Sequence, residues 1–251
     1  VRMNKNSPLN QCYICSIGAD GVQNGWPVMN SISVIRLWCT MPEYSLRISP
    51  TAVSKRCWIW PPMRQARQAF PIQKESQKKI SSNDRLVMQI HYTTNGLATT
   101  DQTRLGLHYA EQAPQQTLMN PITVNEDIYI PAGAHNYQAS ASIVLNDDSY
   151  LYAMSPHMRY RGKSMKYTAV YPDGNSEQLL SVPNFQFQWQ MDYWLKEPKF
   201  LPAGTTIVTD GVFDNSSANP GNPNSDIDVG WGGQSWEEMF IGWMAIAVDT
   251  Q

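Results

Sequence analysis

The pattern of hydrophobic and polar residues changes near residue 84. Beyond that point short alternating or apolar stretches recur, and none of them repeats with the period of an amphipathic helix. Turn sequences that combine Pro, Gly, Asn and Asp separate these stretches. Many short strands with turns between them are typical of an antiparallel sandwich or jelly roll. The apolar stretches include residues 86–92, 128–130, 139–145 and 204–209, and the turns include residues 95–96, 131–133, 172–175 and 202–204.

Residues 1–83 lack this regularity. The Gln- and Lys-rich segment 72–79 follows Pro71 and has the composition of neither a good helix nor a good strand. We therefore expect an irregular N-terminal region over residues 1–83, with part of a first sandwich as the alternative. Residues 112–121 have the composition of an interdomain linker, and residues 214–228 predict a long surface loop.

That loop contains the triplet Asn215-Ser-Ser217. The triplet accepts N-linked glycans in eukaryotic secreted proteins, and it is also common by chance. Both interpretations stay open from the sequence.

The length and net charge of the chain limit the number of domains and the kinds of partner that we expect. At 251 residues the chain can form one large β domain or two sandwiches of about 120 residues each. A formal net charge of −2 gives no electrostatic attraction for nucleic acid or anionic lipid. No run of about eighteen apolar residues is present to span a membrane. Five tryptophans are mostly expected in the sandwich core: Trp189, Trp194, Trp231, Trp236 and Trp243.

All four cysteines lie early in the chain, at Cys12, Cys15, Cys39 and Cys57. The Cys12-x-x-Cys15 pair is compatible with half a zinc site or with a redox motif. Because no neighbouring histidine completes a ligand set, we favour free thiols or disulfides.

The four histidines are the first candidates for metal ligands. His91 stands at the end of a predicted strand, where a rigid sheet would hold a ligand beside an open loop, and a structural role is the alternative. His108 fits one face of a strand, and His135 fits a loop. His157 has more informative neighbours.

Arg159 follows His157 by two residues. Side chains two residues apart on a strand share a face, so a His-x-His pair would direct two imidazoles at one metal ion. Arg159 cannot be the second ligand, because a guanidinium is permanently charged and has no lone pair. Met239 offers a thioether that suits Cu(I), although with twelve methionines in the chain a core role is the alternative.

Short motifs follow one another in a fixed order over residues 85–248. The most informative is Pro156-His-Met-Arg-Tyr-Arg-Gly-Lys163. The others are Gln89-Ile-His-Tyr-Thr-Thr-Asn-Gly96, Leu105-Gly-Leu-His-Tyr-Ala110, Ile130-Pro-Ala-Gly133, Tyr171-Pro-Asp-Gly174, Trp189-Gln190, Leu201-Pro-Ala-Gly-Thr205, Asp214-Asn-Ser216 and Gln234-Ser-Trp-Glu-Glu-Met239. Together they resemble the copper type II, ascorbate-dependent monooxygenases, whose best-known members hydroxylate peptidylglycine and dopamine. The match is closest to bacterial members with the motif Pro-His-Met-His-x-Arg-Gly-Lys.

The resemblance implies two antiparallel jelly-roll sandwiches, each with one copper, that face each other across a solvent-filled gap. It places His157 and Met239 on two of the three ligands of the second, oxygen-activating copper, and Arg159 on the third. It places His91 on one ligand of the first, electron-supplying copper. That copper also needs a His-His pair upstream, and no histidine precedes His91.

The resemblance also implies a domain organisation. Residues 84–116 would end the first, partial or degraded sandwich, and residues 117–251 would form one complete C-terminal jelly roll. An extracytoplasmic location, either periplasmic or secreted, and a small-molecule or peptide substrate would follow.

Three functions remain open from the sequence. The first is an oxidoreductase that hydroxylates a C–H bond with dioxygen and an ascorbate-type reductant, with its copper at low occupancy because ligands are missing. The second is a non-catalytic β-sandwich binding module derived from that family. The third is a structural or adhesive β protein, for which only the composition argues.

Overall fold

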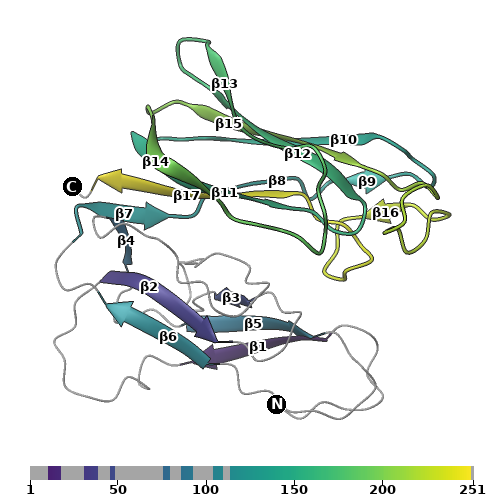
Figure 1. The fold of residues 1–251 in the computed structure, drawn as a ribbon, viewed down its shortest axis with the longest axis horizontal. Helices are drawn as coiled ribbons and strands as arrows, with labels where there is room; N and C mark the ends of the chain where they lie inside the picture. Colours follow the sequence, from purple (N-terminus) through teal and green to yellow (C-terminus); the bar gives the residue numbers. More distant parts are fainter. Residues whose placement is uncertain are drawn as a thin grey trace. The chain divides into compact units, whose positions relative to one another are not determined.

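The computed structural model describes residues 114–249 throughout. Before them it describes the backbone of the strands β1 to β6, which lie between Gln11 and Tyr109. The chain divides into two compact units (Figure 1). Residues 1–118 and 249–251 form the first unit, and residues 119–248 form the second.

Strands are present in the N-terminal part that the sequence pattern describes as irregular. In the first unit β5 (Leu86–Tyr92) pairs antiparallel with β1 (Gln11–Ile17) and with β3 (Leu46–Ile48). The strand β2 (Ser31–Trp38) pairs antiparallel with β4 (Ser76–Lys79) and with β6 (Arg104–Tyr109). A strand therefore forms at residues 76–79, within the segment whose composition predicts a poor strand.

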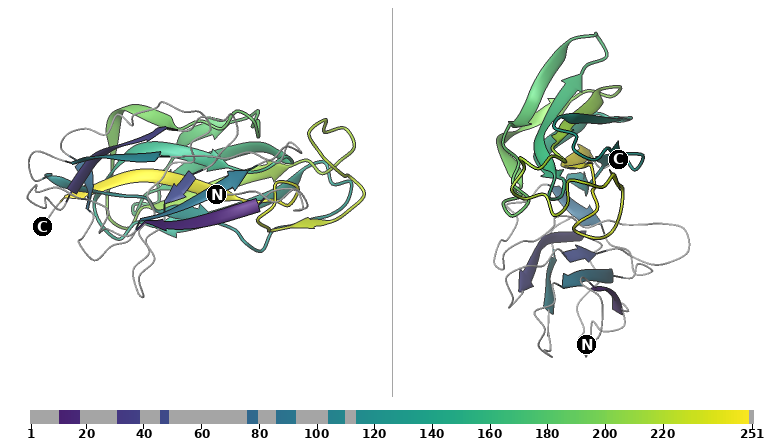
Figure 2. Two further views of the ribbon diagram at one scale, coloured as in Figure 1. Left: turned by 90° about the horizontal axis from the view of Figure 1, so that it is seen from below. Right: turned by 90° about the vertical axis from the view of Figure 1, so that its right-hand side faces the viewer.

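The second unit is built from antiparallel strands in two stacked layers (Figures 1 and 2). One layer has the strand order β10-β15-β12-β13, formed by β10 (Tyr137–Val144), β15 (Thr206–Phe213), β12 (Gly162–Val170) and β13 (Ser176–Val182). The other has β14 (Tyr193–Leu201), β11 (Ser149–His157), β17 (Ile241–Asp249) and β8 (Ile122–Val124) in that order. The short strands β9 (Tyr129–Ile130) and β16 (Val229–Gly230) pair with each other, and β7 (Gln116–Met119) lies at the boundary between the units.

The prediction of an all-β fold is confirmed for residues 114–249, which contain no helix. The three predicted Pro-x-Gly turns also form, and the predicted turn at residues 95–96 lies outside the described residues. Gly133, Gly174 and Gly204 close the three Pro-x-Gly turns with φ angles of 69°, 87° and 84°, a conformation that favours glycine. No helix among the described residues is long and apolar enough to cross a membrane.

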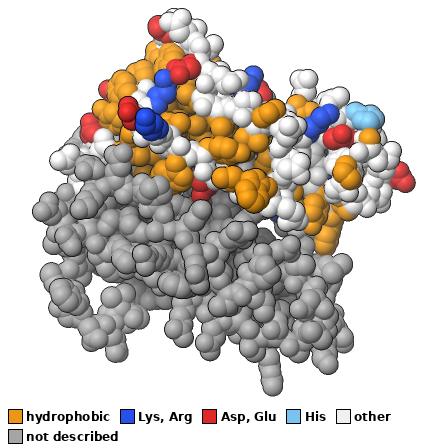
Figure 3. Space-filling model, in the orientation of Figure 1, with side chains coloured by type: hydrophobic (Ala, Val, Ile, Leu, Met, Phe, Trp, Pro, Cys, Tyr) orange, Lys and Arg blue, Asp and Glu red, His pale blue; other side chains and the backbone are white. Residues whose placement is uncertain are grey.

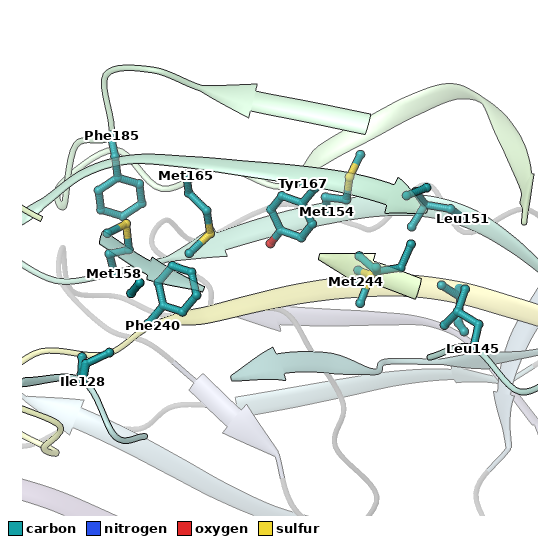
Figure 4. Packing of buried hydrophobic residues seen from close by; sticks show 14 of the residues in the cluster. Ile128, Leu145, Leu151, Met154, Met158, Met165, Tyr167, Phe185, Phe240 and Met244 are labelled. Carbon is teal, nitrogen blue, oxygen red and sulfur yellow. The ribbon is translucent and has the colours of Figure 1, made fainter. Parts of the chain in front are cut away.

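The core lies between the two layers of the second unit (Figure 4). Alternate residues of β15 are buried, as expected for a strand with one face on a core. From β17 and the residue before it, Phe240, Met244 and Ile246 point into this core. The buried cluster also holds Leu151, Met154 and Met158 of the β11 region and Met165 and Tyr167 of β12.

The tryptophans do not all join the core. Trp243 is buried and Trp231 packs partly buried against the cluster. Trp189 and Trp236 are 67% and 41% exposed, so the expectation of core positions is wrong for these two. Figure 3 shows further hydrophobic side chains on one face of the described surface.

Candidate metal centre at the ends of β11 and β17

Three residues that the sequence singles out lie at or near the paired ends of β11 and β17, and two of them, Arg159 and Met239, are in contact. His157 is the last residue of β11, and it pairs with Ile241, the first residue of β17. Arg159 follows His157 by two residues, and Met239 precedes Ile241 by two. The residues next to them along the chain, Met158 and Phe240, are part of the core.

The imidazole of His157 is oriented by Gln190. Its Nδ1 lies 2.7 Å from Oε1 of Gln190. The Gln190 amide nitrogen donates to the carbonyl oxygens of Met158, at 3.0 Å, and Phe187, at 3.1 Å. These two bonds fix which end of the amide faces the imidazole, so Nδ1 is the donor. A neutral His157 then has its lone pair on Nε2, the arrangement of a metal-ligating histidine held by a second residue.

Arg159 lies against the other expected ligand. Its Nη2 donates to the sulfur of Met239 at 3.4 Å and to the carbonyl oxygen of Gly233 at 2.9 Å. Both Arg159 and Met239 are buried, with exposed fractions of 7% and 8%. The structure therefore brings Arg159 and Met239 into contact, with the guanidinium on the sulfur atom.

Glu238 fixes the backbone beneath this contact. The side chain is fully buried, and its two carboxylate oxygens accept the backbone N–H groups of Arg159, at 2.9 Å, and Arg161, at 2.7 Å. Burial raises the pKa of Glu238 to about 7, against the opposing effect of those N–H groups and of the two guanidiniums.

Arg161 is the charged partner of Glu238 and is also fully buried. Its Nη1 lies 3.8 Å from the Glu238 carboxylate and donates to the carbonyl oxygen of Trp236 at 2.7 Å. Its Nε donates to Oδ1 of Asn215 at 2.7 Å, and Nη2 to the carbonyl oxygen of Asn224 at 3.2 Å. Burial lowers the pKa of Arg161, and Glu238 opposes that effect. This side chain joins the 214–228 loop to the segment 231–239.

A second acid, Asp192, is held by a residue of β11. The hydroxyl of Ser155, two residues before His157, donates to the carboxylate of Asp192. Burial raises the pKa of Asp192, and the Ser155 hydrogen bond opposes the shift.

Sequence reasoning located His157, Arg159 and Met239 and missed the roles of Gln190, Glu238 and Arg161. All three stand in the matched motifs, so the signal was present. Apart from the bond of Gln190 to Phe187, their hydrogen bonds cross 32 to 79 residues of sequence, however, and spacing alone cannot assign them.

The other candidate residues lie elsewhere. His135 is in a loop with its side chain 64% exposed, and its Nδ1 is 3.9 Å from Oδ1 of Asp214. His91 belongs to β5 and His108 to β6, and their side chains lie outside the described part of the chain, as do those of the four cysteines.

The donor set does not fit a copper ion. His157 and Met239 offer a neutral nitrogen and a thioether, which are Cu(I) donors. The Arg159 guanidinium, however, contacts the sulfur and adds a permanent positive charge beside it. Among the described residues no group of three or more His, Cys, Asp or Glu side chains could hold a metal ion.

Comparison with known proteins adds no assignment, because neither a protein-family model nor a curated protein matches this chain.

Proposed function

We propose that the chain is a β-sandwich protein of the copper type II, ascorbate-dependent monooxygenase type, and that residues 117–251 have its jelly-roll topology. The proposal rests on the motif order and on one arrangement of side chains. His157 is held by Gln190, and Arg159 contacts Met239, at the ends of two paired strands. These are the positions that the resemblance assigns to the oxygen-activating copper.

The contact between Arg159 and Met239 decides the functional state that we propose. A guanidinium stays protonated at any pH at which the chain is folded, so position 159 cannot supply a lone pair. The same group donates to the thioether that would otherwise face the metal. We therefore propose that the present sequence is a non-catalytic, copper-free β-sandwich module derived from these oxidoreductases.

A working monooxygenase is the second candidate. The orientation of His157 by Gln190 favours it, because such a hydrogen bond prepares an imidazole for a metal. In that case the chain would hydroxylate a C–H bond of a small molecule or peptide with dioxygen and an ascorbate-type reductant. His91 would contribute to the first copper, and the location would be extracytoplasmic.

Copper reconstitution of the full chain separates the two candidates. After incubation with Cu(I) and removal of excess metal, we expect copper far below one ion per chain and no ascorbate-dependent oxygen consumption. Stoichiometric copper would contradict the non-catalytic proposal if it is lost in His157→Ala. The matched control is His135→Ala, which removes an exposed histidine from a loop.

A further inference from the structure

We propose that the Arg159 guanidinium takes the place of the metal as the buried cation that joins the end of β11 to segment 231–239. This inference rests on the proposed function, because it assigns Arg159 to a former ligand position. It goes further in giving the substituted residue a structural role of its own.

The Arg159 side chain bridges the end of β11 and segment 231–239. A metal ion at such a centre would bind groups from two parts of the chain at once. Arg159 begins two residues after β11 and reaches two points of segment 231–239, the carbonyl oxygen of Gly233 at 2.9 Å and the sulfur of Met239 at 3.4 Å. The guanidinium of Arg159, which is anchored just after β11, therefore contacts two separate points of segment 231–239.

The electrostatic surroundings suit a cation. A buried charge is costly unless polar groups surround it. The guanidinium meets a carbonyl oxygen and a thioether, and the backbone N–H of Arg159 donates to the buried Glu238 carboxylate. The charge of the guanidinium in turn lowers the pKa of Glu238, against the larger opposing effect of burial.

The bridge has a consequence for folding. Segment 231–239 carries Glu238 and Met239, both buried, and its position depends on contacts with the β11–β12 connection. All of these contacts are made between protein atoms, Arg159 included. Folding of the chain should accordingly be independent of copper and of chelators.

A double-mutant cycle on the full chain tests the bridge. The variants are Arg159→Met, which removes the charge and keeps the length, Met239→Leu, and both together. We expect each single substitution to lower the unfolding temperature, and the double substitution to lower it by clearly less than the sum. Neither a Cu(I) chelator nor added copper should shift the unfolding temperature of the unsubstituted chain.

Lys166→Met is the matched control. It removes an exposed cation that lies 3.5 Å from Asp210, and exposed ion pairs contribute little to stability. Additive effects at Arg159 and Met239, or a chelator that lowers the unfolding temperature of the unsubstituted chain, would overturn the bridge. Should Arg159→Met fail to fold, Arg159→Lys replaces it in the cycle, with the same additivity criterion.

The proposed function can fail separately. If coupling is present but Arg159→His gains no affinity for copper, Arg159 is a bridge at a position that never held metal. If Arg159→His gains copper and coupling is absent, the former metal centre stands and the bridge is wrong.

Discussion

The side chain at position 159 determines which chemistry the strand ends can perform. A histidine there would present a lone pair, whereas the guanidinium of Arg159 presents only donors in a fixed plane. Its contact with Met239 places a donor on the thioether that the sequence suggests as a ligand. In the function that we propose, the charge at this one residue separates a metal centre from a closed structural contact.

The contact of Arg159 with Met239 could be expected from the motif order. The contact of Arg159 with the Gly233 carbonyl oxygen could not be expected, because it depends on the path of an irregular segment.

The environment of Asn215 could not be predicted either, because it depends on contacts with distant segments. Its triplet suggests a glycan, but the side chain is fully buried and its Nδ2 donates to the carbonyl oxygens of Pro131 and Ile227, both at 2.9 Å. The glycosylation interpretation is wrong for the folded chain.

Asn215→Ala should destabilise the chain by roughly 3 kcal/mol or more, because it leaves several buried partners unsatisfied, Nε of Arg161 among them. Urea unfolding of the full chain measures the change. Ser217→Ala destroys the same triplet and leaves Asn215 in place, so it should unfold at the urea concentration of the unsubstituted chain. Equal midpoints for the Asn215 and Ser217 variants would show that the buried network contributes nothing.

At the scale of single elements, local chemistry decided what could be predicted. The alternating stretches 86–92 and 139–145 coincide with β5 and with most of β10, and the Pro-x-Gly turns form as expected. The strand β4 was missed because its sequence, Ser-Gln-Lys-Lys, has no apolar alternation. Its pairing with β2 depends on its position beside that strand in the fold rather than on its own composition.

Close approach of the two layers explains a glycine on β17. A Cβ at Gly242 would lie 2.4 Å from Oγ1 of Thr123 and 2.6 Å from Cγ2 of Thr209. The two threonine hydroxyls are hydrogen-bonded at 2.7 Å in the buried space that this glycine leaves. The glycine is required here by packing between the sheets.

Gly242→Ala should therefore cost about 1–3 kcal/mol of unfolding free energy through overpacking. Gly230→Ala is the control, since its Cβ would meet nothing nearer than the carbonyl oxygen of Ile128 at 3.6 Å. Urea unfolding of the two variants compares them directly. If Gly242→Ala were as stable as Gly230→Ala, the layers would not be packed as tightly as described.

At the scale of the whole molecule, the sequence predicts a β protein with short strands, and residues 114–249 confirm it. The order of strands within each layer could not be predicted, because β15 pairs with β10 and β12, which precede it by many residues, and only β12 and β13 are neighbours both in the chain and in the sheet. The same non-local pairing between β11 and β17 creates the site. The motifs indicate His157 and Met239 as candidate residues, and the pairing of β11 with β17 brings their segments side by side.

The central claim is that His157, position 159 and Met239 form a copper-type centre that the Arg159 guanidinium closes. Arg159→His in the full chain, loaded with Cu(I) and studied by metal analysis and copper X-ray absorption, tests it most directly. We predict stoichiometric copper with nitrogen and sulfur ligands, and loss of the sulfur signal when Met239→Leu is added. No gain of copper over the unsubstituted chain, or bound copper without sulfur, would contradict the claim.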